Sequence, residues 1–170
     1  MTSSDENFIP LIDLAPWFDG DDSARAELAA TVDAQLQRCG FLVVVNHGID
    51  PLVLAEARAA CTDFFHQPEA EKAKLTPIND AYRGWIGGGK ESNAATYGVD
   101  TPPDLKETFA YGTVDVRDES LRAEHPTWYA PNQWPSAPST LQPAAELFWR
   151  EALRLADELL QLFALALGLE

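Results

Sequence analysis

The sequence CGFLVVVNHGID, residues 39–50, joins a run of apolar, mostly β-branched residues to a turn that carries a histidine. The run FLVVV is apolar on both faces, which predicts a buried strand. Asn46, His47 and Gly48 then predict a turn, and Asp50 before a proline is typical of a helix start. Whether His47 is a metal ligand, a catalytic base or a turn residue decides how much chemistry this stretch carries.

Strands and helices alternate on the N-terminal side of this stretch. Residues 8–12, FIPLI, predict a short strand. Residues 24–39 repeat apolar side chains at helical spacing, with Asp22 or Ser23 as the N-cap. Gly40 follows at the position where a left-handed C-cap favours glycine. The order strand, helix, strand, helix predicts a mixed α/β fold.

The C-terminal side contains further helices, a long loop and a strand. Pro51 opens a helix, and residues 68–75 form a short acidic one. Residues 76–104 have no clear period, which predicts a long loop of a kind that often carries function. Residues 105–112, LKETFAYG, alternate like a strand, and residues 141–167 predict a long helix. The apolar stripe of the helix after Pro51 consists of Val53, Ala57, Cys61 and Phe64.

The terminal helix has a broad apolar face. Its members are Leu147, Phe148, Leu155, Leu159, Leu162, Phe163, Ala166 and Leu167. Packing against other helices of the chain can cover part of this face. Its width favours a sheet as the main partner, supplied by residues beyond Glu170.

Composition and charge limit the classes of function. The formal net charge of −15 comes from 12 Lys and Arg against 27 Asp and Glu, which disfavours binding to nucleic acid or to a membrane surface. The two cysteines, Cys39 and Cys61, form no CxxC pair, so neither a disulfide scaffold nor a structural zinc site is expected. The N-terminus has no secretion signal, and a cytoplasmic protein is expected.

A metal site built on His47 lacks its partners. A mononuclear non-haem iron site needs two histidines and a carboxylate on one face of the metal, and jelly-roll enzymes begin this pattern with His-x-Asp or His-x-Glu. His47, His66 and His125 are followed by GID, QPE and PTW, so none of them starts such a tripeptide. We therefore expect His47 to be a turn residue.

Arg83 is the strongest candidate for a ligand-binding residue in this sequence. In AYRGW it stands between the aromatic residues Tyr82 and Trp85, at the start of the long loop. A guanidinium pairs with a carboxylate through two parallel hydrogen bonds, and flanking rings can orient it and exclude water. The alternative is a surface arginine that stacks on a neighbouring ring for packing alone, and the residues leave both interpretations open.

Seven motifs occur in one order along residues 8–169. They are IPLIDL, CGFLVVVNHGID, FF before QPEAEK, YRGW, DLKETFAYG, NQWP and the terminal LLQLFALALGL. Together they resemble the N-terminal region of the isopenicillin N synthase-like family of iron(II)/2-oxoglutarate-dependent oxygenases. The resemblance implies helices and short strands that flank a double-stranded β-helix, or jelly roll, whose core is largely absent from this chain.

The resemblance also implies where the chemistry lies. The family's iron ligands and its 2-oxoglutarate clamp lie in the C-terminal half, so ligands for Fe(II) and 2-oxoglutarate are expected beyond Glu170. No catalytic residue and no metal ligand is expected in this chain. Members of the family line the substrate entrance with the loop around YRGW, which makes Arg83 a candidate partner for a substrate carboxylate, with Tyr82 and Trp85 as walls.

Three segments and two functions follow from the resemblance. Residues 1–7 are expected to be a flexible N-terminus, residues 8–139 the dioxygenase N-terminal region, and residues 140–170 the helix that packs on the missing jelly roll. The chain is then part of an oxygenase that hydroxylates, desaturates or cyclises a small molecule, and it is inactive alone. The alternative is a short, non-catalytic scaffold or regulatory subunit that binds a homologous chain through its terminal helix.

Overall fold

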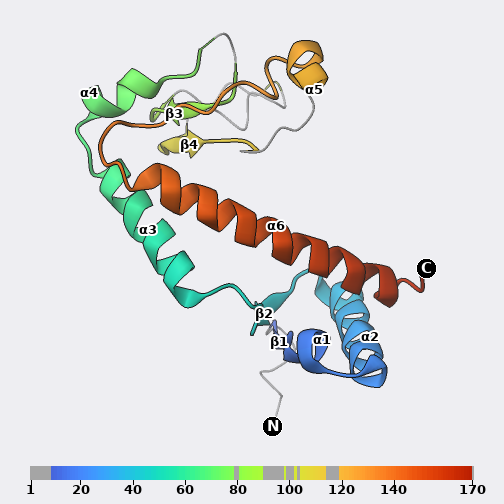
Figure 1. Cartoon of the computed structure of the whole chain (residues 1–170). Coiled ribbons are helices and arrows are strands. Elements are labelled where there is room, and N and C mark those ends of the chain that lie inside the picture. The colour runs from blue at the N-terminus through green and yellow to red at the C-terminus, as the bar shows by residue number, and fades with distance from the viewer. Residues whose placement is uncertain are drawn as a thin grey trace. The chain divides into compact units, whose positions relative to one another are not determined.

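The computed structural model describes residues 9–78, 81–89, 98, 102, 104–113 and 119–169. The chain divides into two compact units (Figure 1), Met1–Pro51 with Arg150–Glu170, and Leu52–Trp149. The predicted flexible N-terminus, residues 1–7, lies outside the described residues. Among the described residues, no helix combines the length and the apolar character that a membrane crossing requires.

The first unit is built on a short parallel pair of strands. Its elements are β1 (Leu11–Asp13), α1 (Ala15–Asp19), α2 (Asp22–Cys39), β2 (Val43–Val45) and the C-terminal part of α6 (Leu141–Ala166). β1 and β2 pair in parallel, with Leu11 opposite Val43. Parallel strands need a crossover connection, and α2 supplies it, as the alternation of strand and helix predicted.

Both ends of α2 have the type of cap that the sequence predicted, but only the C-cap lies at the predicted position. Gly40 follows the helix with a φ of 71°, so the predicted left-handed C-cap is confirmed. The N-cap is Asp21, whose carboxylate accepts a hydrogen bond of 2.9 Å from the amide of Ala24. The prediction of Asp22 or Ser23 was wrong because Asp22 already lies in the first turn.

The prediction of β2 as a fully buried strand was wrong. Val43 is 42% exposed, and Phe41 just before it is 66% exposed. Leu42 and Val44, which alternate with these residues, pack against the core of the first unit, so the strand is covered on one face and exposed at Val43 on the other. Apolar character on both faces of a strand therefore did not mean burial on both faces.

His47 is a turn residue, as predicted. Its Nδ1 accepts a hydrogen bond of 3.2 Å from the amide of Ile49. Asn46 and Gly48 on either side adopt positive φ angles of 53° and 77°, which asparagine and glycine tolerate best. The side-chain amide of Asn46 also donates to Asp13 at 2.8 Å, which ties the turn to the end of β1.

Five of the eight predicted members of the apolar face of the terminal helix are covered by the core of the first unit, whereas Leu147 and Leu167 are exposed. Leu162 is 1% exposed and belongs to the core cluster of Ile12, Leu28 and Val32. Four other predicted members pack against the same core, namely Leu155, Leu159, Phe163 and Ala166. A second row of apolar residues, which the sequence did not single out, faces outward instead and contains Leu153, Ala156 and Leu160.

The second unit combines helices with an antiparallel pair of strands. Its elements are α3 (Pro51–Phe65, from Leu52 onward), α4 (Glu69–Lys72), the 3-10 turn η1 (Ala73–Leu75), β3 (Gly84–Ile86), β4 (Thr108–Ala110), α5 (Glu119–Glu124) and the start of α6. β3 pairs with β4, and Trp85 lies opposite Phe109. The predicted loop 76–104 therefore contains a strand, and much of its remainder lies outside the described residues.

The core of the second unit corrects the predicted stripe of α3. Ala60 and Phe64 are buried together with Trp85 and Leu141, and Phe109 packs against them. Cys61, a predicted stripe member, is exposed. The buried face of α3 thus contains Ala60 in place of Cys61, whereas the predicted member Phe64 is buried and meets the ring of Phe109 edge-on with centroids 4.8 Å apart.

Candidate functional site

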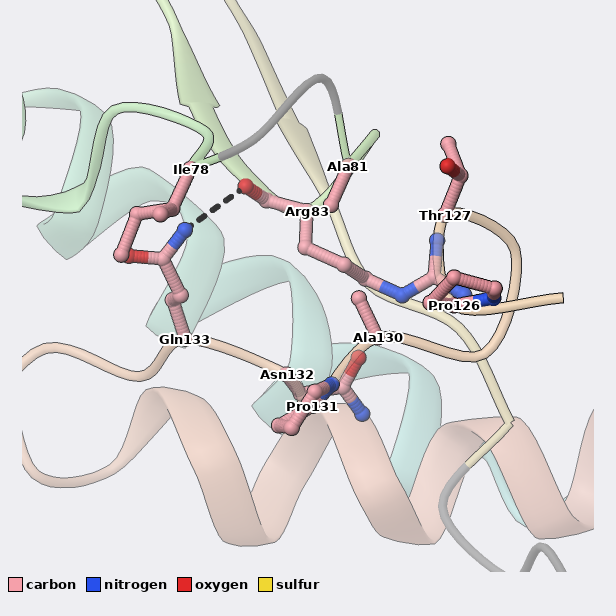
Figure 2. Close-up of a pocket in the computed structure, with 9 residues that line it drawn as sticks. All are labelled: Ile78, Ala81, Arg83, Pro126, Thr127, Ala130, Pro131, Asn132 and Gln133. Carbon is pink, nitrogen blue, oxygen red and sulfur yellow. Dashed lines mark hydrogen bonds between the residues drawn. The ribbon is translucent and has the colours of Figure 1, made fainter. Parts of the chain in front are cut away.

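Arg83 lies just before β3, where the strand meets two loops. Its Nη1 donates to the carbonyl oxygen of Tyr82 at 2.8 Å, and its Nη2 donates to the carbonyl oxygen of Trp128. The main-chain carbonyl oxygen of Arg83 accepts from the side-chain amide of Gln133 at 3.0 Å, the dashed contact in Figure 2. Arg83 therefore joins the start of β3 to the proline-rich segment 126–135.

Gly112 leaves the space that the guanidinium of Arg83 fills. A Cβ atom at position 112 would collide with Nη2 of Arg83. The side chain of Asn132 closes the same corner from the other direction, because its Oδ1 accepts from the amide of Gly112 at 2.8 Å and its Nδ2 donates to the carbonyl oxygen of Gly112 at 3.2 Å. The end of β4, Arg83 and Asn132 thus hold one another in place.

A pocket of about 510 Å³ opens beside Arg83 (Figure 2). We call it the Arg83 pocket. Its lining consists of Ile78, Ala81, Arg83, Pro126, Thr127, Ala130, Pro131, Asn132 and Gln133. Figure 2 shows the side chain of Arg83 reaching from the strand end toward the segment that carries Pro126 and Thr127. The pocket is of a size that small-molecule sites commonly have, and one cation contributes to a lining that is otherwise uncharged.

The structure separates the three residues that the sequence grouped together. Arg83 lines the pocket, whereas neither Tyr82 nor Trp85 belongs to the described residues that line it. Tyr82 is exposed, and the side chain of Trp85 is buried in the core of the second unit. Trp85 therefore supports the strand that carries Arg83 and does not contribute to the wall of this pocket.

Trp85 also contacts an ion pair that is buried at Lys72 and partly exposed at Glu107. Its Nε1 donates to Oε2 of Glu107 at 2.6 Å. Lys72, which is 7% exposed, donates to the same carboxylate at 2.6 Å and to the carbonyl oxygen of Phe65 at 3.0 Å. Burial disfavours the charged form of Glu107, but the hydrogen bonds from Lys72 and Trp85 and the charge of Lys72 outweigh it, so the pKa of Glu107 is lowered.

Sequence reasoning missed Asn132, Gln133 and Gly112 as parts of the site. Asn132 and Gln133 belong to the motif NQWP, which carried the resemblance without a stated role. The sequence signal that could have indicated them is a pair of polar amide residues directly before Trp134 and Pro135. Their partners lie twenty and fifty residues away, so the sequence alone did not identify them.

A metal centre is not visible in this part of the protein. Among the described residues, no group of three or more His, Cys, Asp or Glu side chains is arranged to hold a metal ion. The residues that are described therefore do not fit an iron site.

Known proteins match this chain over most of its length. A family model described as the N-terminal region of a non-haem dioxygenase in morphine synthesis matches residues 9–137. A validamycin A dioxygenase from Streptomyces hygroscopicus subsp. limoneus is 29% identical over 95% of this chain and 44% of its own length. The 2-oxoglutarate-Fe(II) type oxidoreductase hxnY of Emericella nidulans is 27% identical over 95% of this chain and 46% of its own length.

A solved structure shares the fold. A full-length Neurospora crassa protein, crystallised with alpha-KG and thymine, superposes with a TM-score of 0.77 at 23% sequence identity. The match covers 99% of this chain and 51% of that protein. The chain thus spans about half the length of the proteins that it matches.

Proposed function

Because this chain belongs to the non-haem dioxygenase N-terminal family, within the iron(II)/2-oxoglutarate oxygenases, we propose that it forms the N-terminal part of an enzyme that oxidises a small organic substrate. The resemblance to this superfamily that the sequence motifs indicated is confirmed. The observation that carries the proposal is the family match over residues 9–137 together with relatives of twice the length. No observation favours the alternative of a non-catalytic scaffold subunit.

Fe(II) and 2-oxoglutarate supply the oxidising chemistry in such enzymes when they are bound. We propose that their ligands belong to a segment that follows these residues in a full-length protein, since the described residues do not fit an iron site. The part of the chain described here then binds and orients the substrate and excludes water from it. The cytoplasmic location expected from the sequence stays a prediction.

Arg83 is the proposed substrate-binding residue. Its guanidinium lines the Arg83 pocket and is held in place by two main-chain carbonyl groups. A fixed guanidinium loses little conformational entropy when it pairs with a carboxylate. Tyr82 next to it is exposed and does not line this pocket, so its role as a wall stays a prediction, whereas the burial of Trp85 favours a role in positioning the strand.

The outward row of α6 is the proposed contact with the rest of the enzyme. Leu153, Ala156 and Leu160 are exposed at helical spacing, and Leu160 is 65% exposed. Apolar rows of this kind on a helix mark a surface that another element covers. We propose that the C-terminal jelly roll implied by the family supplies that element.

The experiment is an assay of the full-length protein that contains these residues. We expect conversion of 2-oxoglutarate to succinate that requires iron and stops when a chelator removes it. A protein consisting of residues 1–170 alone is expected to form no succinate. If the natural protein has the 18.7 kDa mass of this chain and shows no turnover, the scaffold subunit becomes the better interpretation.

A further inference from the structure

A second, smaller pocket adjoins the corner that Arg83 and Asn132 form. It has a volume of about 210 Å³, and both Arg83 and Arg122 of α5 line it. We call it the two-arginine pocket. Two guanidinium groups around one cavity are unusual in a chain with a net charge of −15, because so few of its residues are basic.

Each of the two arginines has a buried N–H donor without a hydrogen-bond partner among the described residues. These donors are the Nε–H groups of Arg83 and Arg122. A buried donor without a partner has lost its hydrogen bonds to water, which costs free energy, and more so when the group is charged, so native proteins rarely leave one unpaired. Both residues line the pocket, and an anion that reached these donors would accept from them and remove that cost.

Neither guanidinium is neutralised by a carboxylate in the described part of the chain. The terminal nitrogens of Arg83 donate to two carbonyl oxygens, which carry no net charge. No ion pair of either arginine with a described acidic residue occurs. Among the described residues that line the pocket, Glu146 is the one that is acidic, and it accepts a hydrogen bond of 2.9 Å from Gln142 one turn earlier on α6.

The lining charge selects the class of ligand. Arg83 and Arg122 contribute two positive charges and Glu146 one negative charge, which leaves a net charge of +1 for the described lining. One carboxylate balances this charge, whereas a dicarboxylate such as 2-oxoglutarate would exceed it. Tyr129 and Trp134 provide aromatic surface in the same lining, and Thr113 adds a hydroxyl.

We infer that the two-arginine pocket binds the carboxylate of a small monocarboxylic acid, with Arg122 as a binding residue that pairs with it alongside Arg83. The ligand's carboxylate oxygens accept from the guanidinium groups, and its apolar body lies against Tyr129 and Trp134. Use of this pocket for the enzyme's substrate rests on the proposed function. Binding of the anion depends only on the contacts described above.

The test is calorimetric titration of the full-length protein with benzoate. Benzamide serves as the neutral ligand of the same shape. The titration is carried out without oxygen and with excess 2-oxoglutarate, so that a site for that dicarboxylate is already filled. We expect benzoate to bind and benzamide to bind at least tenfold more weakly.

Arg122→Gln is the deciding variant, and Arg122→Lys keeps the charge but loses the planar fork. The matched control is Arg58→Gln, an exposed arginine of α3 in the same unit. We expect Arg122→Gln to weaken benzoate binding about tenfold, Arg122→Lys to weaken it less, and Arg58→Gln to leave it unchanged. Thermal unfolding of each variant checks that it is folded.

Three outcomes would overturn the inference. They are no binding of benzoate, equal binding of benzoate and benzamide, and equal affinity in the wild-type and Arg122→Gln proteins. The succinate assay reports on the proposed function separately. If benzoate binds through Arg122 but no iron-dependent formation of succinate is measured, the anion-binding inference is supported and the proposed oxygenase function is contradicted.

Discussion

The ion pair between Lys72 and Glu107 is a side-chain contact whose loss should destabilise the second unit. Glu107→Gln leaves the Lys72 ammonium buried without a counter-charge. A fully buried pair would lose roughly 3–5 kcal/mol, and because the Glu107 side chain is 32% exposed we expect about 2 kcal/mol, measured by urea unfolding. Glu71→Gln, in an exposed pair with Lys74, is the control and should cost less than about 1 kcal/mol.

The same pair predicts a dependence on pH. Because the folded protein lowers the pKa of Glu107, its contribution to stability is complete above the ordinary value of 4.5 and is lost as the pH falls through the folded-state pKa. Unfolding free energies measured on a series from pH 6 downward should therefore converge for the wild-type and Glu107→Gln proteins at the acid end. A difference that stays constant over the whole series would contradict this assignment.

Gly112→Ala tests the placement of Arg83 without changing its charge. The new Cβ atom occupies the space of Nη2, so the guanidinium must leave its carbonyl partners. We expect benzoate affinity to fall about tenfold, with a loss of about 1 kcal/mol in unfolding free energy because the displaced group is the end of a flexible side chain. Gly88→Ala, whose Cβ would make only an ordinary contact at 3.6 Å, should change neither quantity.

At the level of elements, the C-cap of α2 offers a test of backbone conformation alone. Gly40 has a φ of 71°, and a Cβ atom there would meet nothing within 4 Å. Gly40→Ala is therefore expected to cost about 1 kcal/mol through the left-handed conformation only, and Gly40→Asn clearly less. Thermal unfolding compares the two variants, and equal losses would mean that a contact and not the backbone sets the cost.

The three long helices could be predicted from the sequence, and so could the short helix α4, whereas the short helices α1 and α5 could not. α2, α3 and α6 show apolar residues at helical spacing, and the observed ranges of α2 and α6 and the start of α3 agree with the prediction to within two residues. α1 and α5 contain five and six residues, too few to show a period. α1 is held instead by a distant contact, since Trp17 donates to Glu158 at 2.8 Å.

At the level of the whole molecule, a substitution in the outward row of α6 tests whether another part of the full-length enzyme covers this row or whether it faces water. If another part of the full-length enzyme covers this row, Leu160→Gln should lower its unfolding free energy by about 2 kcal/mol, the value of one buried leucine. Gln161→Ala, on an exposed neighbour, is the control and should have little effect. A change of less than about 0.5 kcal/mol in Leu160→Gln would mean that the row faces water.

The site itself shows what a sequence can and cannot reveal. Arg83 stood out because two aromatic residues flank it, and the structure places it at both pockets. Arg122 has no such neighbours and lies in a helix that the sequence did not predict. Both pockets combine segments that are far apart in the chain, so only tertiary structure brings Arg122 and Asn132 to Arg83.

The divided first unit has a consequence for synthesis on the ribosome. Its core needs Leu162, yet Ile12, Leu28 and Val32 emerge before the roughly one hundred residues of the second unit are made. At roughly 5–20 residues per second, these apolar side chains wait about 5 to 20 s for their partner helix. The contiguous second unit can therefore close first, and the N-terminal helices are the segment that a nascent-chain chaperone has reason to hold.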